Sequence, residues 1–393
     1  MLLLAPFAPR LDATHGGGRA MAQLVRALGA RESVGLVCCR ADDEPPIDPR
    51  VAECCEWVEE VRRPWGGPAA WRRLRLLAGL ARGRPTMATR WRVPGLAARV
   101  AARTREWAPA VVQAEYHVMT AYFPPASSLS PPAVRVLVEY EPGVAGASNA
   151  LEAAAWWRWE RRALERCDAV VAFTARDRRS LEALGAGAPV VEIPLGAEIP
   201  AVPLDPRGRE GRLLFVGNCM HPPNRDAAAR LARAVLPLVR RRMPGATLDL
   251  VGDAPTADVL ALGGDGVTVH GRVPAVEPFL DAAAVVVAPL RLGGGMRVKV
   301  LEALAAGKAV VATPLAVEGL ALRDGEQMLL GESDEELAAA VARLLEEPAR
   351  RAALAAGARA WAVAHLGWPA VADAYGALYG RLLAAGPRPG RAP

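Results

Sequence analysis

The pattern of apolar positions changes twice between residues 285 and 313. Residues 285–290 form a short apolar run rich in β-branched side chains, which is typical of a parallel strand covered on both faces. Residues 300–304 then show helical spacing, and residues 309–312 form a second apolar run. Gly307 stands where the helical spacing stops and is expected to end the helix. The segment therefore predicts one strand-helix-strand unit with parallel strands.

A glycine-rich turn joins the first of these strands to the helix. Gly293, Gly294 and Gly295 free the backbone to turn sharply, and Arg297 and Lys299 follow at the start of the helix. Unpaired N–H groups at a helix start favour a phosphate, whereas cations there oppose the helix dipole. Lys299 is one of only two lysines beside 46 arginines, and a compact ammonium suits a phosphate. The pattern favours a phosphate site, with an ordinary crossover helix and solvated charges as the alternative.

The same alternation of strands and helices occurs on both sides of a polar linker. Prolines and glycines recur between residues 200 and 211, and this linker predicts an N-terminal domain at 1–203 and a C-terminal domain at 212–365. The strands are expected at 2–5, 33–39, near Trp57, 110–114, 134–138, 168–173 and 190–193, and at 212–216, 248–252, 267–271, 285–290 and 309–312. Both domains are therefore expected to be α/β, with doubly wound parallel sheets.

Residues 61–105 hold twelve arginines and no acidic residue, with tryptophans and leucines between them. Such a segment could lay an apolar and cationic face on an anionic membrane, or bind a phosphate-bearing lipid acceptor. A pair of solvated amphipathic helices is the plainer interpretation. Nucleic acid is not expected as a partner, because the segment has no nucleic-acid recognition motif and the net charge is only +6.

Composition narrows the cellular setting. The chain has 393 residues, of which 52% are hydrophobic, and this length favours two domains with cores of their own. Its six cysteines lack metal-ligand spacing, which favours reduced thiols and a cytoplasmic location. The apolar run at the start is short for a signal peptide, and no run of eighteen apolar residues occurs. We therefore expect a cytoplasmic protein that could also lie peripherally on the inner face of the membrane.

Polar residues in the first half mark a second candidate site. Glu115 and His117 follow an expected strand, where a parallel sheet presents side chains to ligands, and they are the candidates for catalytic residues. A lone histidine is nevertheless more often structural. Gly17 and Gly18 belong to another glycine-rich connection between a strand and a helix, which is a candidate phosphate-binding turn or a plain tight turn.

The chain resembles GT-B glycosyltransferases of the family 4 type in two motifs. One motif comprises Gly295, Arg297, Lys299, Leu301, Glu302, Ala303, Ala305, Gly307, Val310, Val311, Ala312 and Thr313, and the other comprises Phe215, Val216, Gly217, Pro222, Pro223, Asn224, Asp226 and Ala227. The resemblance implies that Glu302 holds the nucleotide ribose. It also implies that the glycine-rich turn, including Met296, holds the diphosphate with Arg297 and Lys299. Gly294 replaces the second glutamate that many members carry.

The resemblance further implies two Rossmann-like domains that face a cleft, with the acceptor on the N-terminal domain and the nucleotide sugar on the C-terminal domain. Gly17 and Gly18 would lie near the donor phosphates or the acceptor. Gly217 and Asn224 would lie in the donor site, and Arg272 and Val273 beside the base. The last helix, expected at 368–385, would pack back onto the N-terminal domain.

The implied reaction is transfer of a sugar from a nucleotide diphosphate sugar, with UDP or GDP as the expected nucleotide. It would proceed with retention, without a metal or cofactor, to a glycan, lipid-linked or small-molecule acceptor in cell-envelope, exopolysaccharide or glycoside synthesis. Two alternatives stand beside it. One is a catalytically silent GT-B homologue that binds anionic lipid or protein, and the other is a nucleotide-sugar epimerase.

Overall fold

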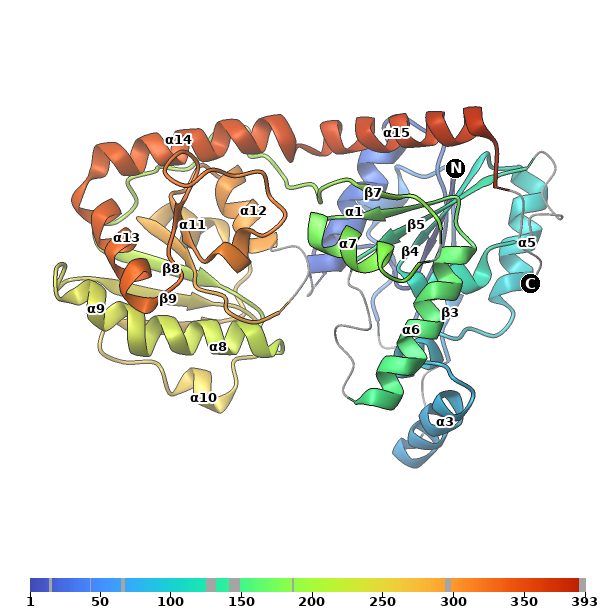
Figure 1. Cartoon of the computed structure of the whole chain (residues 1–393), viewed down its shortest axis with the longest axis horizontal. Coiled ribbons are helices and arrows are strands. Elements are labelled where there is room, and N and C mark those ends of the chain that lie inside the picture. Colours follow the sequence, from blue (N-terminus) through green and yellow to red (C-terminus); the bar gives the residue numbers. More distant parts are fainter. Residues whose placement is uncertain are drawn as a thin grey trace. The chain divides into compact units, whose positions relative to one another are not determined.

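The computed structural model describes residues 1–13, 16–42, 44–64, 68–124, 132–140, 149–185, 187–293 and 298–388. The chain divides into two compact units, each built around a parallel sheet (Figure 1). Unit 1 comprises Met1–Pro194 with Val371–Pro393, and unit 2 comprises Leu195–Ala370.

Unit 1 contains a seven-stranded sheet in the order β3-β2-β1-β4-β5-β6-β7, in which every neighbouring pair is parallel. The strands are β1 (Leu2–Ala5), β2 (Gly35–Arg40), β3 (Trp57–Arg62), β4 (Val111–Glu115), β5 (Val134–Glu139), β6 (Ala169–Ala172) and β7 (Val190–Glu192). The described helices are α1 (Gly16–Gly29), α2 (Pro49–Ala52), α3 (Ala69–Ala81), α4 (Thr86–Arg90), α5 (Leu96–Trp107), the 3₁₀ helix η1 (His117–Tyr122), α6 (Ala150–Glu165) and α7 (Ala175–Glu182). The doubly wound sheet predicted from the alternating pattern is confirmed.

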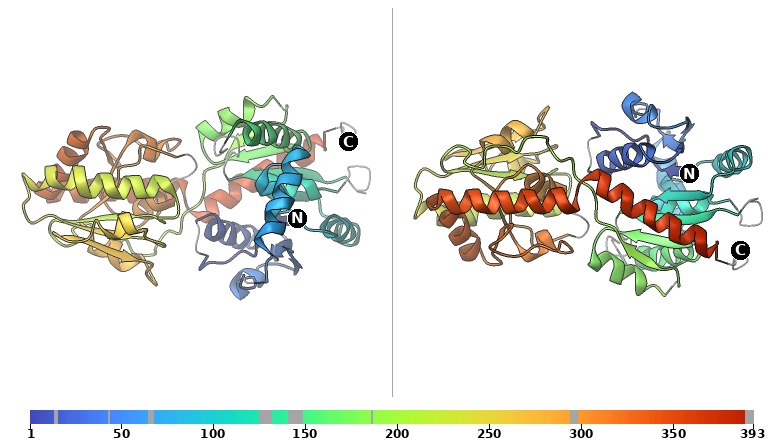
Figure 2. Two further views of the ribbon diagram at one scale, coloured as in Figure 1. Left: turned by 90° about the horizontal axis from the view of Figure 1, so that it is seen from below. Right: turned by 90° about the horizontal axis from the view of Figure 1, so that it is seen from above.

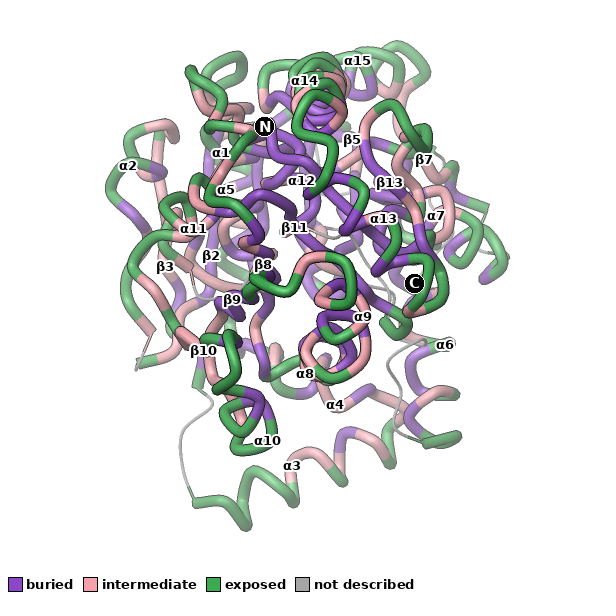
Figure 3. The backbone as a smooth tube through the Cα atoms, turned by 90° about the vertical axis from the view of Figure 1, so that its left-hand side faces the viewer, coloured by how far each residue is buried: buried purple, intermediate pink, exposed green. Residues whose placement is uncertain are grey.

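Two local expectations for unit 1 differ from the structure. The glycines of the first connection do not form a turn before the helix, because α1 already begins at Gly16 and includes Gly17 and Gly18. The arginine-rich segment forms three helices, α3, α4 and α5, rather than a pair. Gly83 and Gly95, both with positive φ, lie beside the breaks, and Pro85 caps the start of α4, so backbone chemistry divides the segment. Much of α3 is exposed (Figure 3).

Unit 2 contains a six-stranded sheet in the order β10-β9-β8-β11-β12-β13, again parallel throughout. Its strands are β8 (Arg212–Val216), β9 (Thr247–Val251), β10 (Val267–Gly271), β11 (Val285–Ala288), β12 (Val310–Ala312) and β13 (Leu329–Leu330). Its helices are α8 (Pro222–Arg230), which continues through the π-helical η4 (Leu231–Val235) into α9 (Leu236–Arg240), then α10 (Ala257–Leu260), α11 (Glu277–Ala282), α12 (Val298–Ala305), the 3₁₀ helix η5 (Pro314–Val317), α13 (Asp334–Glu346) and α14 (Pro348–His365).

The strand-helix-strand unit predicted at residues 285–313 is confirmed as β11, α12 and β12. Gly307 has φ of 74° and its N–H donates to the carbonyl of Leu304, while the N–H of Lys308 donates to the carbonyl of Ala303. This pair of bonds is the Schellman arrangement, which ends a helix at a glycine. Strands β11 and β12 are fully buried, as a sheet covered on both faces requires.

The last helix, α15 (Trp368–Ala385), lies along the strands of unit 1 from Val371 onward (Figure 2). Its Tyr379 hydroxyl donates to Oε1 of Gln113 in β4 at 2.5 Å, and Asp373 accepts from Arg31 at 2.8 Å. Tyr375 and Tyr379 are almost wholly buried. Helix α15 therefore contributes two tyrosines to the interior of a unit whose other residues come from the first half of the chain.

Strand order also shows where each sheet would bind a ligand. In both units the chain reverses its winding direction beside the first strand, between β1 and β4 in unit 1 and between β8 and β11 in unit 2. Open α/β sheets bind ligands at the carboxyl ends of the strands on either side of such a switch point. The residues that follow β8 and β11, and those that follow β1 and β4, are therefore the first places to look for chemistry.

Candidate functional site

Lys299, in the first turn of α12, connects the two sides of the switch point in unit 2. Its ammonium donates a hydrogen bond to Oδ1 of Asn224, in the first turn of α8, and lies 4.7 Å from the centroid of the Phe215 ring. Asn224 is itself oriented, because its Nδ2 donates to the carbonyl oxygen of Asn218 at 2.8 Å. The ammonium group is thus held by an amide oxygen and an aromatic face at the carboxyl end of the sheet.

Two glycines allow the connection after β8 to pack closely beside this lysine. A Cβ on Gly217 would lie 2.9 Å from Cγ of Asn224, and a Cβ on Gly252 would lie 1.8 Å from the carbonyl oxygen of Gly217. Both positions exclude a larger side chain without movement of their neighbours. The carboxyl ends of β8 and β9 therefore present bare backbone next to Asn224.

An ion pair that was not predicted from the sequence joins the two sides of the same switch point. Arg291, directly after β11, donates two hydrogen bonds of 2.8 Å to the carboxylate of Asp226 on α8. Asp226 belongs to the motif after β8, so the motif marked one member of the pair. Its partner could have been sought among the arginines at the ends of neighbouring strands. The Asp226–Arg291 pair connects α8 to the segment after β11, and the Asn224–Lys299 contact connects α8 to α12.

The glycine-rich turn is only partly described. Gly293 has φ of 97°, a left-handed conformation that favours glycine. The rest of the turn lies outside the described residues, namely Gly294, Gly295, Met296 and Arg297. Their contact with a diphosphate therefore stays a prediction. Helix α12 begins at Val298 and includes Glu302, which is partly buried and stands one turn after Lys299. Residues three apart share one helix face, so Glu302 and Lys299 are neighbours on α12.

Arg272 and Val273 follow β10 directly, two strands away from β8 in the sheet order. Arg272 is exposed and Val273 is partly buried. Because the strands are parallel, these two residues lie at the same edge of the sheet as the connections after β8 and β11. The structure therefore brings Gly217, Asn224, Lys299 and the two residues after β10 to one edge.

The second lysine has a different environment. The side chain of Lys308 is fully buried, and its ammonium donates to the backbone carbonyl oxygens of Asp205 and Asp281. Burial lowers the pKa of Lys308 to about 8. Lys308 therefore holds together segments of unit 2 that are far apart in sequence, whereas Lys299 lies at the edge where a parallel sheet binds ligands.

In unit 1, Gly17 and Gly18 lie in the first turn of α1, which follows β1. Gly18 is buried and Gly17 is partly buried. The N-terminus of α1 therefore lies beside the switch point of unit 1.

Glu115, at the end of β4, is buried in a network of neutral side chains. Its Oε1 accepts a hydrogen bond from Nε2 of Gln113 at 2.6 Å, and its Oε2 accepts from the hydroxyl of Tyr140 at 2.8 Å. The hydroxyl of Tyr379 donates to Gln113 and completes the chain of contacts. Burial raises the pKa of Glu115 to about 7, although the two hydrogen bonds to it act in the opposite direction. The carboxyl group can therefore hold or release a proton near neutral pH.

His117, at the start of η1, is also buried and is paired with a carboxylate. Its Nδ1 lies 2.8 Å from Oε2 of Glu139, and its ring stands edge-on to Trp156 at 4.8 Å. Burial lowers the pKa of His117, but the negative charges of Glu139 and Glu160 outweigh this effect, so the pKa is raised. Both candidates from the sequence therefore point into the interior of unit 1, each with its own acidic or amide partner.

Tyr116, between these two residues, has a strained backbone. Its φ of 67° with ψ of 142° is a conformation that a bulky side chain rarely adopts. Its ring stacks on Tyr140 at 4.3 Å and stands edge-on to Phe7, which follows β1, at 5.8 Å. Strain of this kind persists only where the surroundings fix it. Here aromatic contacts fix it beside the switch point of unit 1.

Among the described residues, no group of three or more His, Cys, Asp or Glu side chains is placed to hold a metal ion. All six cysteines are free thiols, and burial raises the pKa of Cys39 to about 12. In the described part of the chain, no helix has the length and apolar character needed to cross a membrane.

Solved structures that match nearly the whole chain define its fold class. Sucrose-phosphate synthase from Thermosynechococcus elongatus matches 98% of this chain and 99% of its own, with a TM-score of 0.72 and 20% identity. The HepE protein of Anabaena, solved with UDP, matches 97% and 99% with a TM-score of 0.68 and 14% identity. The lipopolysaccharide outer core galactosyltransferase WaaB matches 97% and 100% with a TM-score of 0.60 and 11% identity. The two parallel, doubly wound units thus form a GT-B fold.

Family models identify the chain more closely. Residues 14–199 match the model of Glycosyltransferase Family 4, and residues 210–347 match the model of Glycosyl transferases group 1. The chain belongs to the group 1, family 4-type glycosyltransferases. The resemblance seen in the motifs after β8 and β11 is therefore confirmed. No curated protein sequence matches the chain.

Proposed function

We propose that the chain transfers a sugar from a nucleotide diphosphate sugar to an acceptor, with unit 2 as the donor-binding unit and unit 1 as the acceptor-binding unit. The observation that carries the proposal is the position of Lys299. Its ammonium is fixed by Asn224 and Phe215 at the switch point of unit 2, where parallel sheets bind ligands. A fixed cation beside helix N-termini suits a diphosphate.

In this proposal Lys299 binds the diphosphate and Glu302, on the same helix face, binds the ribose. Arg297 and the glycine-rich turn of residues 293–296 complete the phosphate site, and Arg272 and Val273 border the base. Gly17 and Gly18 supply N–H groups near the donor phosphates. UDP is the nucleotide we expect, since three of the similar structures were solved with it and one with UDP-glucose.

The reaction would proceed with retention and without a metal ion. Cleavage of the glycosidic bond leaves negative charge on the departing diphosphate. Lys299 and the helix N–H groups would neutralise that charge, a role that preorganised donors fulfil without reorganisation. The departing phosphate would accept the proton of the acceptor hydroxyl as the new bond forms. Glu115 and His117 remain the candidates in unit 1 for contact with the acceptor or for positioning it.

Calorimetric titration of UDP, GDP, ADP and TDP into the purified chain tests the donor site. We expect UDP to bind with a dissociation constant in the micromolar range, about −8 kcal/mol, and to bind equally well in the presence of EDTA. GDP binding in place of UDP would keep the function and change the base. Binding by none of the four nucleotides would overturn the proposal and favour a catalytically silent homologue.

We also propose that unit 1 docks on an anionic membrane surface through α3. Trp71, Leu74 and Leu77 recur at helical spacing and are 65%, 59% and 65% exposed, an unusual degree for large apolar side chains. Arg72 and Arg73, on the same helix, are also exposed. An exposed apolar stripe flanked by guanidinium groups complements a bilayer that contains acidic lipids.

Vesicle sedimentation tests this docking. The wild-type chain is expected to sediment with vesicles that contain phosphatidylglycerol. It is expected to stay in the supernatant with vesicles of pure phosphatidylcholine. Replacing Trp71, Leu74 and Leu77 by serine should weaken binding at least tenfold, because three apolar side chains no longer enter the interface. A matched triple variant replaces Val202, Leu260 and Val363, exposed apolar residues of unit 2, and should bind as the wild type does. Equal binding by both triple variants would contradict the assignment to α3.

A further inference from the structure

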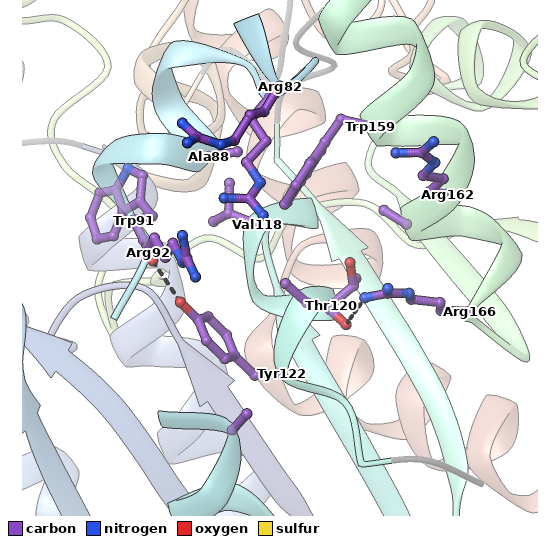
Figure 4. Close-up of a pocket in the computed structure, with 14 residues that line it drawn as sticks. Arg82, Ala88, Trp91, Arg92, Val118, Thr120, Tyr122, Trp159, Arg162 and Arg166 are labelled. Carbon is purple, nitrogen blue, oxygen red and sulfur yellow. Dashed lines mark hydrogen bonds between the residues drawn. The ribbon is translucent and has the colours of Figure 1, made fainter. Parts of the chain in front are cut away.

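A cavity of about 390 Å³ lies within unit 1 (Figure 4), and neither Glu115 nor His117 lines it. Its walls come from the end of α3, the connections around α4, the start of α5, η1 and α6. The volume is within the usual range for small-molecule sites. The complete lining is Arg82, Arg84, Ala88, Trp91, Arg92, Ala97, Val118, Thr120, Ala121, Tyr122, Trp159, Arg162, Ala163 and Arg166.

The cavity is strongly cationic and contains no acidic lining residue. Five arginines line it, three from the arginine-rich segment and two from α6 and its end. In the described part of the chain none of the five pairs with a carboxylate. The guanidinium groups of Arg82 and Arg166 donate only to backbone carbonyl oxygens, of Ala78 and Thr120. Arg82, Arg92, Arg162 and Arg166 are exposed and Arg84 is partly buried, so these guanidinium groups are open to a phosphate from solution, which they can bind with paired N–H donors.

The rest of the lining is mostly apolar. Figure 4 shows Trp91 and Arg92 on one side of the cavity and Trp159, Arg162 and Arg166 on the other. The hydroxyl of Tyr122 donates to the carbonyl of Trp91 at 2.9 Å and accepts from the N–H of Val93 at 2.7 Å. The Nε1 of Trp159 is buried and has no hydrogen-bond partner among the described residues.

We propose that this cavity binds an amphiphile that consists of an apolar chain and a diphosphate or phosphate group. The arginines would hold the anionic group, and the tryptophan, tyrosine and alanine side chains would cover the first part of the apolar chain. A sugar alone would leave the five positive charges unneutralised, and a bare anion would leave the apolar walls unused. The identification of this ligand as the acceptor rests on the proposed function, whereas its binding to the cavity does not.

Titration with three probes tests the chemistry, with tryptophan fluorescence or calorimetry as the readout. Farnesyl diphosphate is expected to bind at least tenfold more tightly than either inorganic pyrophosphate or farnesol. If pyrophosphate bound as tightly as farnesyl diphosphate, the apolar chain would add nothing to affinity. The proposal of an amphiphilic ligand would then be wrong, and the cavity would be an anion site. Farnesol that binds as tightly would show that the arginines play no part, and would also overturn the proposal.

Matched double variants locate the site. Arg92→Ala with Arg162→Ala removes two lining charges and should weaken farnesyl diphosphate binding at least tenfold while leaving UDP binding unchanged. Arg105→Ala with Arg158→Ala removes two exposed charges from α5 and α6 outside the cavity, and should leave both ligands unaffected. If both double variants lost the same amount of farnesyl diphosphate affinity, the loss would reflect net charge alone. That result would contradict binding in this cavity. Failure of the wild-type chain to bind UDP would instead contradict the proposed function and leave the cavity proposal untouched.

Discussion

The Glu115→Gln variant is expected to gain stability relative to the wild type as the pH rises, by about 2 to 3 kcal/mol between pH 5 and pH 8. Glu115 has a pKa of about 7 in the folded chain against 4.5 for an unperturbed glutamate. Between these values the folded state keeps a proton that the unfolded chain has released. The free energy of unfolding of the wild type therefore falls as the pH rises through this window, and a glutamine, which does not titrate, removes that loss.

The network around Glu115 can accept this substitution. A glutamine oxygen can accept from Gln113 as Oε1 of Glu115 does, and the new amide can donate to the hydroxyl oxygen of Tyr140. His117, whose pKa is raised above 6.5, also lowers the stability of the folded state as the pH rises past that value. Its contribution is present in both proteins and cancels in their difference.

Urea unfolding at pH 5 and pH 8 measures the effect, followed by tryptophan fluorescence because eight of the ten tryptophans lie in residues 1–194. Glu53→Gln is the matched control, since Glu53 is an exposed carboxylate of the same unit. Its difference from the wild type should be the same at both pH values. A Glu115→Gln difference that is equally insensitive to pH would show that Glu115 titrates normally.

Hydrophobic periodicity predicted the parallel sheets well, because buried parallel strands are short apolar runs whose positions survive in any context. The β11-α12-β12 unit is the clearest example: Gly307 adopts the left-handed conformation that ends a helix, and few other residues do so without strain. The arginine-rich segment was harder. Its periodicity alone does not show where a helix stops, and the breaks beside Gly83, Pro85 and Gly95 divide it into three helices.

The environments of individual side chains were less predictable than the elements that carry them. Glu115 and His117 were expected at the edge of a sheet, where ligands bind. Both are buried instead, because Tyr140 donates to Glu115 and Glu139 pairs with His117. Helix α15 supplies a partner to β4 across a sequence separation of 266 residues, which no local pattern reports. The rarity of lysine likewise drew attention to Lys299 and Lys308. It did not show that Lys299 lies at the edge of the sheet and Lys308 in the interior.

Lys299→Ala and Glu302→Ala are each expected to weaken nucleotide binding about tenfold to a hundredfold, or about 1.5 to 3 kcal/mol, while the fold remains intact. Their ligand preferences should differ. If Lys299 binds the diphosphate, its loss should weaken UDP much more than UMP, because UMP lacks the second phosphate. If Glu302 binds the ribose, its loss should weaken UDP and UMP by the same factor.

Calorimetry with UDP and UMP on both variants separates these roles. Arg343→Ala provides the control, since it removes one positive charge from α13 in the same unit and breaks only an exposed pair with Glu347. A fall in UDP affinity shared by Arg343→Ala would indicate a general effect of charge. The Lys299 assignment fails if Lys299→Ala binds UDP as the wild type does, and the ribose assignment fails if Glu302→Ala weakens UDP alone. If Glu302→Ala weakened UDP alone, the Glu302 carboxylate would act on the diphosphate, through the turn proposed to bind it at residues 293–297. It would not act on the ribose.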